Sequence, residues 1–368
     1  MYSDALRRER GLRTPICQIC HRRTSLIAVA LGICADCIRE RFDQALPAIQ
    51  AAHAASRAAF DLPVAPPRQS GGVQCMLCGN ECLIGEGERG FCGLRKVRQG
   101  RLVHLAGTPQ CGLLHWYRDP LPTNCVADWV CEGSRHPGSH NLAVFYASCT
   151  SNCLFCQNWH YRQTSPTRSQ TISAAELAAQ ANQRTFCVCF FGGDPASQMA
   201  HALATSKLLA QRGVRVCWET NGMMHPRLLE AAVQYSLESG GCVKFDLKAF
   251  DESIHIALTG VSNRRTLENF ARAAQRYGER PELPLVIAST LLVPGYVDTD
   301  QVEHIARWIA SFDVRIPYAL LAFAPNFYMH DLPCTAVKHA LEAEAAARSA
   351  GLINVRIGNR HLLGLGWG

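Results

Sequence analysis

Residues 142–159 read LAVFYASCTSNCLFCQNW, a short apolar run that leads directly into three closely spaced cysteines. The apolar run is rich in residues that favour strands, so it predicts a buried strand. Cys149, Cys153 and Cys156 follow, separated by three and then two residues. This spacing lets one loop wrap three soft thiolates around an iron–sulfur cluster. Because no fourth cysteine lies nearby, one iron of a 4Fe–4S cluster would stay open to a substrate. The alternatives are that a distant cysteine completes a closed electron-transfer cluster, or that the three are buried structural thiols.

Downstream of these cysteines, short apolar runs alternate with helical patterns. One helix start is marked by Ser173 with Glu176 three residues later, the signature of a capping box. Such alternation predicts a parallel sheet with helical crossovers. We expect an α/β fold, a partial (β/α)6 barrel of about six βα units that begins near residue 141. The apolar runs occupy residues 142–148, 186–191, 214–219, 242–247, 283–292, 318–324 and 354–357.

Length, charge and hydrophobic content limit the kind of protein that this chain can be. The 368 residues carry a formal net charge of +7, and 48% of them are hydrophobic, enough for one large domain and one or two small ones. Basic residues are scattered and form no face with interleaved aromatics, so nucleic-acid binding is not expected. No stretch approaches the ~18 apolar residues of a membrane span. No apolar leader opens the chain, and we expect a cytoplasmic location.

Cysteine is unusually abundant, with nineteen residues in the chain. In a reducing compartment, clustered cysteines indicate metal binding rather than disulfides. Cys17 and Cys20 form one C-x-x-C pair, and Cys34 and Cys37 form a second after thirteen intervening residues. Two such pairs are typical of tetrahedral zinc, and a rubredoxin-like iron site is the alternative.

A second group of cysteines comprises Cys75, Cys78, Cys82 and Cys92. Four thiolates suffice for structural zinc or for a closed auxiliary cluster, and either a structural role or a redox relay stays open. The remaining cysteines have no regular spacing. Cys111, Cys125 and Cys131 are either further ligands or unrelated thiols, and the others are expected to pack in the core: Cys187, Cys189, Cys217, Cys242 and Cys334.

These differences in composition and pattern divide the chain into four predicted regions. They are a zinc-ribbon-like or rubredoxin-like module at 1–45, an Ala-rich helical segment with a Pro- and Gly-containing linker at 46–72, a Cys-rich module at 73–140, and the partial barrel at 141–368.

The cysteine motif, with Phe155 just before its last cysteine, resembles the signature of the radical S-adenosylmethionine superfamily. The longer string CLFCQNW is similar to the subgroup of the pyruvate formate-lyase-activating enzyme, and closer still to the radical enzyme of the AmmeMemoRadiSam system. The group that begins at Cys75 resembles the N-terminal motif of that second type. The resemblance covers residues 73–368.

Three further motifs follow in the order that the resemblance implies, each at the C-terminal end of a predicted strand, where parallel α/β folds bind ligands. Gly192-Gly193-Asp194-Pro195 resembles the Gly-Gly-Glu-Pro segment that meets the amino group of the nucleotide's methionine. Glu219-Thr220-Asn221 and Asp246-Leu247-Lys248 resemble the next two motifs. In the activating enzyme, the positions that match Glu219, Thr220 and Asp246 contribute to a monovalent-cation site. Asp194 departs from the usual Glu, and Ala196 from the commoner Thr.

The resemblance implies that the reduced cluster cleaves S-adenosylmethionine to methionine and a 5′-deoxyadenosyl radical, which abstracts hydrogen from a protein, a peptide or a small molecule. It implies an electron donor such as flavodoxin or ferredoxin as a partner, and a protein is one of the substrate classes that it leaves open. Two alternatives stay open from the sequence. One is a non-catalytic iron–sulfur electron carrier or zinc-dependent binding protein, and the other is aminocarboxypropyl transfer by cleavage of a different C–S bond.

Overall fold

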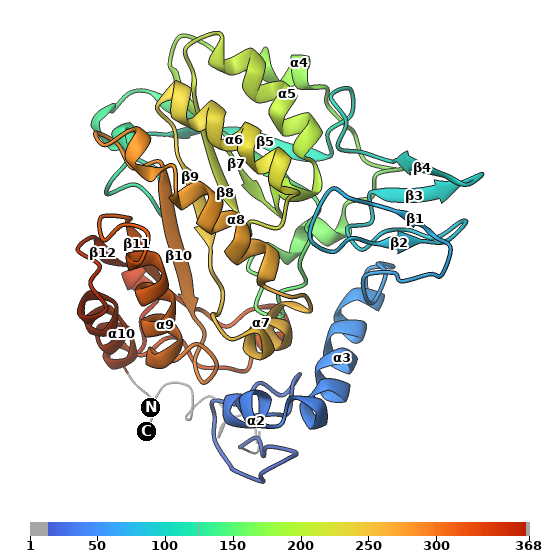
Figure 1. Cartoon of the computed structure of the whole chain (residues 1–368), viewed down its shortest axis with the longest axis vertical. Helices are drawn as coiled ribbons and strands as arrows, with labels where there is room; N and C mark the ends of the chain where they lie inside the picture. Colours follow the sequence, from blue (N-terminus) through green and yellow to red (C-terminus); the bar gives the residue numbers. More distant parts are fainter. Residues whose placement is uncertain (1–13, 124, 366–368) are drawn as a thin grey trace.

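The computed structural model describes residues 14–123 and 125–365 and is organised around one large, mostly parallel sheet (Figure 1). The strand order is β12-β11-β10-β9-β8-β7-β6-β5. The parallel strands are β6 (His140–Tyr146), β7 (Thr185–Gly192), β8 (Arg215–Thr220), β9 (Val243–Asp246), β10 (Val286–Leu292), β11 (Tyr318–Ala322) and β12 (Val355–Gly358). Each falls on one of the seven apolar runs of the sequence, and the first six are each followed by a helix before the next strand, which confirms the predicted α/β fold with about six βα units.

The eighth strand, β5 (Leu114–Pro120), pairs antiparallel with β6 and forms an edge of the sheet. The sequence places this segment in the preceding Cys-rich module, but the strand belongs to the main sheet. Its side chains are mostly exposed or half-buried. An antiparallel edge strand can leave one face in water, so its apolar pattern is weak.

The helices that follow the strands cover the outer face of the sheet (Figure 1). They bury the outward side chains of the strands completely, among them Phe190, Trp218 and Phe245. The predicted capping box is present, since the Ser173 hydroxyl accepts from the Glu176 amide at 3.2 Å and the Glu176 carboxylate accepts from the Ser173 amide at 2.8 Å. The helices are α4 (Ala174–Ala178), α5 (Met199–Ala210), α6 (Pro226–Ser239), α7 (Glu252–Thr259), α8 (Arg264–Ala274), α9 (Thr299–Ala310) and α10 (Val337–Ser349), and the 3-10 turns are η1 (Glu132–Arg135), η2 (Trp159–Gln163), η3 (Pro195–Ser197), η4 (Tyr277–Glu279), η5 (Phe327–Met329) and η6 (Arg360–Leu362).

The N-terminal part of the chain packs against helix α7 of the α/β domain. Helices α2 (Ala35–Glu40) and α3 (Phe42–Ala58) lie beside α7, as Figure 1 shows in blue. Two small antiparallel ladders follow, β1 (Val73–Gln74) with β2 (Leu83–Ile84) and β3 (Arg95–Arg98) with β4 (Arg101–His104). The first thirteen residues of the predicted 1–45 module lie outside the described residues. Among the helices that the structure describes, none combines the length and apolarity that a membrane crossing needs.

Candidate functional site

The three-cysteine loop begins just after β6 and is held by backbone bonds to distant segments. Its Asn152 and Leu154 amides donate to Thr259 and Leu258 at the end of α7, at 2.8 and 3.0 Å. Cys153 is buried, while Cys149 and Cys156 are half-buried. Burial raises the pKa of the Cys153 thiol to about 11, so this thiol is protonated until a metal displaces the proton.

Asn152, in the middle of that loop, is completely buried and bonded on every side. Its side-chain nitrogen Nδ2 donates to His53 Nδ1 and to the Ser56 hydroxyl, both at 2.8 Å, and both partners belong to α3. Its carbonyl oxygen accepts from Arg162 Nη1 at 2.5 Å. Since His53 accepts at Nδ1, its proton is on Nε2, which faces the carbonyls of Ile256 and Ala257 at 3.1 Å. Helix α3 therefore helps to hold the cysteine loop, a role that the sequence did not indicate.

Arg162 brings a buried positive charge to the same loop. Only 6% of its surface is exposed, and its Nε and Nη2 have no hydrogen-bond partner among the described residues. Cys149, Cys153 and Cys156 are all close enough to contribute to its electrostatic environment. A buried guanidinium with unsatisfied donors is costly, and an anionic group beside the thiols would offset that cost.

Asp194 connects the C-terminal ends of β7 and β8. One carboxylate oxygen accepts from the Ala196 amide at 2.7 Å and from the Thr220 hydroxyl at 2.9 Å, and the other accepts from the Asn221 amide at 2.6 Å. Burial raises the pKa of Asp194 to about 6, against the lowering effect of these bonds. In this arrangement the carboxylate organises the turn around it, and its predicted contact with an ammonium group stays a prediction.

Asn221 links the motif after β8 to the cysteine loop. Its side-chain nitrogen lies 2.9 Å from the Thr150 hydroxyl, 3.0 Å from the Ser151 hydroxyl and 3.7 Å from Cys149 Sγ. The structure therefore brings together two motifs that are 72 positions apart in sequence.

The paired glycines after β7 are needed for packing against β6. Gly192 has a φ of +100°, and a Cβ there would meet the Phe145 ring at 2.7 Å. A Cβ at Gly193 would collide with the backbone oxygen of Ser148. Pro195 is buried at the start of the η3 turn. These glycines let the chain pass close to the end of β6 and the start of the cysteine loop.

Two acids lie at the ends of β8 and β9. Glu219 is 3.5 Å from the ammonium group of Lys244, and Asp246 forms an ion pair with Lys248. The other oxygen of Asp246, Oδ1, is buried without a hydrogen-bond partner in the described part of the chain. Lys248 lies over the Phe155 ring at 5.6 Å from the centroid, which places it beside the cysteine loop. The unpaired Oδ1 of Asp246 fits the predicted cation site. Both acids also form ion pairs with lysines, so a cation would share them with Lys244 and Lys248.

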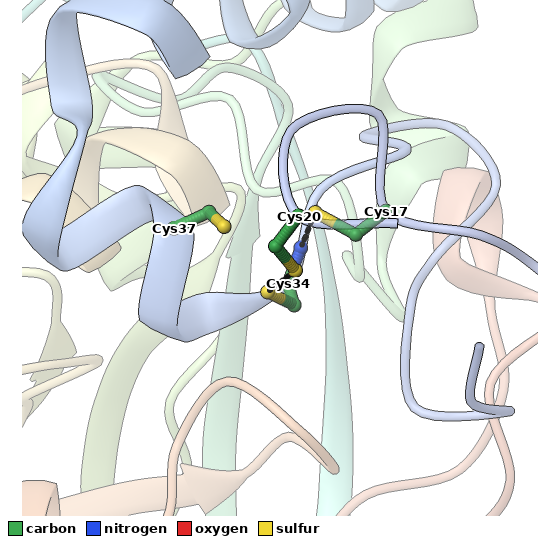
Figure 2. Close-up of side chains that lie close together, drawn as sticks. All are labelled: Cys17, Cys20, Cys34 and Cys37. Atoms are coloured by element: carbon green, nitrogen blue, oxygen red, sulfur yellow. Dashed lines mark hydrogen bonds between the residues drawn. The ribbon is translucent and has the colours of Figure 1, made fainter. Parts of the chain in front are cut away.

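The four N-terminal cysteines converge on one point (Figure 2). Within the described ranges, Cys17, Cys20, Cys34 and Cys37 are the one set of three or more potential ligands whose donor atoms all lie within 4.8 Å of one another. The Cys20 and Cys34 sulfurs are 3.7 Å apart, close to the edge of about 3.8 Å that a tetrahedron of thiolates around zinc has. This donor set, which we call the four-cysteine centre, fits a single tetrahedral metal ion.

The four-cysteine centre is attached to the barrel loop that follows β10. The Tyr296 hydroxyl accepts from the Ala28 amide and donates to the Ile33 carbonyl, both at 3.0 Å. Arg39 of α2 adds ion pairs to Asp251 at 3.1 Å and Asp298 at 2.7 Å. The centre therefore lies at the C-terminal edge of the sheet, where the other motifs are.

The second Cys group lies beside the motif after β8. The Gly79 amide donates to Met223 at 2.8 Å, and the His225 amide donates to Leu77 at 2.9 Å. Its members are Cys75, Cys78 and Cys82, which are buried, and Cys92, which is half-buried. In the described part of the chain their sulfurs do not gather as tightly as those of the four-cysteine centre, so the ligand role of this second group stays a prediction.

Comparisons with known proteins identify relatives of this chain. Residues 143–309 match the family model described as the radical SAM superfamily. An isethionate sulfite-lyase activating enzyme of Oleidesulfovibrio alaskensis is 34% identical over 36% of this chain and 40% of its own length. A putative glycyl-radical enzyme activating enzyme of Methanocaldococcus jannaschii is 30% identical over 50% of this chain and 68% of its own length. A solved domain of a pyruvate-formate lyase-activating enzyme from Bacteroides vulgatus covers 47% of this chain and 99% of that domain, with 20% identity and a TM-score of 0.38.

The fold and the three-cysteine loop define an α/β protein with a C-x3-C-x2-C loop after a strand of a mostly parallel sheet. The chain belongs to the radical S-adenosylmethionine superfamily, and it is similar to activating enzymes. The match spans only 40% of the length of the isethionate sulfite-lyase activating enzyme. The closer resemblance to the AmmeMemoRadiSam-system enzyme stays a prediction.

Proposed function

We propose that the chain holds a 4Fe–4S cluster on Cys149, Cys153 and Cys156 and cleaves S-adenosylmethionine to generate a 5′-deoxyadenosyl radical. When bound, the cluster supplies the electron that breaks the C–S bond. One observation carries the proposal: the three thiols of one loop lie beside a buried positive charge, that of Arg162 on η2. Each thiolate of a four-iron cluster binds a different iron, so these sulfurs need not crowd as they would around one ion.

The chain's own residues have separate roles in this proposal. Arg162 offsets the negative charge of a thiolate-bound cluster, and Asn152 fixes the position of Arg162. Asp194 and Asn221 hold the ends of β7 and β8 against the cysteine loop, where Gly192, Gly193 and Pro195 form the floor for the nucleotide. Glu219, Thr220 and Asp246 would surround a monovalent cation, with Lys248 and Phe155 on the side nearest the cysteine loop.

The central test is the product formed from S-adenosylmethionine by the anaerobically reconstituted, reduced full chain. We expect 5′-deoxyadenosine and methionine, detected by liquid chromatography and mass spectrometry. Cys153→Ala should lose this product, whereas Cys334→Ala, which changes a thiol of the loop before α10, should retain it. Equal product from Cys153→Ala and the wild type would refute the assignment of the loop.

The same reaction mixture separates the alternatives. Methylthioadenosine in place of 5′-deoxyadenosine would indicate aminocarboxypropyl transfer, because a different C–S bond would have broken. A reducible cluster without any consumption of S-adenosylmethionine would indicate a non-catalytic electron carrier.

We further propose a protein or peptide as the substrate and a flavodoxin or ferredoxin as the electron donor. The support is that the relatives are named for the enzymes that they activate. A small-molecule substrate is the alternative. Incubation with candidate glycyl-radical enzymes, followed by electron paramagnetic resonance, tests the first class through a protein-based radical signal.

The four-cysteine centre is proposed to hold zinc, with iron as the alternative. Its position against Tyr296 supports a structural role. Zinc and iron per chain are measured in the wild type and in a Cys17→Ala/Cys20→Ala variant, and the metal that the variant loses is the metal of the four-cysteine centre.

A further inference from the structure

Three cysteines form a row across neighbouring strands of the parallel sheet. Cys189 of β7 is in register with Cys217 of β8. Trp218 is in register with Val243 of β9, so Cys217 lies beside Cys242, the residue just before that strand. Because side chains alternate along a strand, these three thiols share one face of the sheet. The opposite face carries Val188, Val216 and Val243, all completely buried.

The face with the three cysteines is the one that carries Glu219 and Asp246 at its C-terminal edge, since they are separated from the cysteines by even steps along the same strands. The loop between β5 and β6 closes over this face and adds Cys125 and Cys131. These five cysteines and Cys187 surround a cavity of about 50 Å³. A cavity of this size is several times the space that one water molecule occupies.

Lys244 projects into this group and is only 2% exposed. Its ammonium group is 3.0 Å from Cys125 Sγ and 3.1 Å from Cys189 Sγ, and 3.5 Å from the Glu219 carboxylate. A buried lysine is stabilised by polar and anionic neighbours, which here are the Glu219 carboxylate and the sulfurs of Cys125 and Cys189.

Simple packing explains these cysteines poorly. Thiols that only fill a core need neither a buried ammonium group at hydrogen-bond distance nor a cavity at their centre.

The spacing of the thiols selects the kind of metal centre. Within the described residues, the sulfurs of this set do not gather within 4.8 Å of one another as those of the four-cysteine centre do, whereas a tetrahedron of thiolates around one zinc ion has an edge of about 3.8 Å. In a four-iron cluster each thiolate binds a different iron, and in a two-iron cluster the thiolates are divided between the two irons, with inorganic sulfide between the irons. The wider set therefore fits a cluster better than a single ion, in contrast to the four-cysteine centre.

We propose that Cys125, Cys189, Cys217 and Cys242 hold a small iron–sulfur cluster inside the barrel, separate from the three-cysteine loop. Lys244 offsets the negative charge of the thiolates and connects the cluster, through Glu219, to the C-terminal edge of the sheet. Cys189 and Cys242 are buried, as the sequence predicted, and the proposal adds a ligand role to their place in the core.

The test compares iron and acid-labile sulfide per chain in full-length protein that has been reconstituted anaerobically. The loop variant Cys125→Ala and the strand variant Cys217→Ala are measured beside the wild type and the control Cys334→Ala. Both test variants should lose the iron and sulfide of one cluster and keep the signal of the other, whereas the control should match the wild type. Mössbauer spectra should lose one component in the same two variants.

Unchanged iron and sulfide in both variants would overturn the proposal, as would a loss of zinc alone. Circular dichroism identifies a variant that fails to fold. If Cys217→Ala is unfolded, the loop variant decides the question, because Cys125 lies outside the strands. The comparison does not depend on cleavage of S-adenosylmethionine, so an inactive enzyme would leave its result interpretable.

Discussion

Asn152, in the middle of the three-cysteine loop, donates a hydrogen bond of 2.8 Å to Nδ1 of His53 on helix α3. The two residues are 99 positions apart, and both are buried. This bond joins the N-terminal segment to the loop that is proposed to hold the catalytic cluster. The N-terminal helices are therefore part of the support of the site and not an independent appendage.

Replacing His53 by Ala tests that connection. The change leaves the Asn152 amide without one acceptor and removes the bonds to the end of α7, so the free energy of unfolding should fall by about 1–3 kcal/mol. Urea denaturation measures the loss. The exposed His361 gives the matched control, and its Ala variant should unfold like the wild type. If His53→Ala unfolds at the same urea concentration as the wild type, α3 does not support the loop.

Arg162→Gln should make the reduction potential of the cluster more negative. The substitution removes a buried positive charge beside the three thiols, and that charge favours the state with one more electron. Anaerobic spectroelectrochemistry measures the potential. Arg168→Gln serves as the control, because Arg168 is exposed on the same loop. A shift of equal size in both variants would attribute the effect to the general charge of the surface.

The stability of the protein should fall as the pH drops from about 6.5 to about 4. His201 is completely buried between the Tyr146 hydroxyl at 2.8 Å and the Ile172 carbonyl at 3.0 Å, and burial lowers its pKa to about 4. Below the ordinary histidine value the unfolded chain binds the proton and the folded chain does not, so protonation favours unfolding. The loss for this residue is about 3 kcal/mol at most.

Denaturant unfolding at several pH values tests this prediction with His201→Gln. The variant should show a smaller loss of stability across that range than the wild type, whatever its stability at neutral pH. His53 and His255 also have pKa values lowered to about 4 by burial, so part of the pH dependence should remain. A variant with the full wild-type slope would show that His201 does not contribute.

The motifs at the strand ends were predictable because each is a local pattern at the end of an apolar run. The capping box at Ser173 was predictable for the same reason. The sequence could not indicate β5 as part of the main sheet, since its half-exposed side chains carry little periodicity. Nor could it pair Asn152 with His53, or align Cys189 with Cys217, because only the packing of helices and the register of the strands bring such distant residues together.

Tyr296→Phe tests how the four-cysteine centre is docked. The variant loses the hydrogen bonds to the Ala28 amide and the Ile33 carbonyl, which are then buried without this partner. The free energy of unfolding should therefore fall by about 1–3 kcal/mol. The metal at the centre should stay bound, because Tyr296 is not a ligand. Thermal unfolding and zinc or iron content together check both statements. Loss of the metal in Tyr296→Phe would mean that docking and metal binding are one event.

Asp194→Asn tests whether the carboxylate organises the turn or only binds the nucleotide. Asn keeps one acceptor oxygen, but its NH₂ group faces the N–H of either Asn221 or Ala196. Two donors then point at each other, and one of these hydrogen bonds is lost. The affinity for S-adenosylmethionine should fall at least about tenfold, equivalent to roughly 1.4 kcal/mol, and the free energy of unfolding should fall as well, even without the nucleotide. Titration calorimetry measures the first effect and urea denaturation the second.

Asp194→Glu provides the comparison, because Glu is the residue that the family usually has at this position. A variant that loses affinity while keeping wild-type stability would show that Asp194 acts only on the nucleotide, and that the turn between β7 and β8 is held by its backbone.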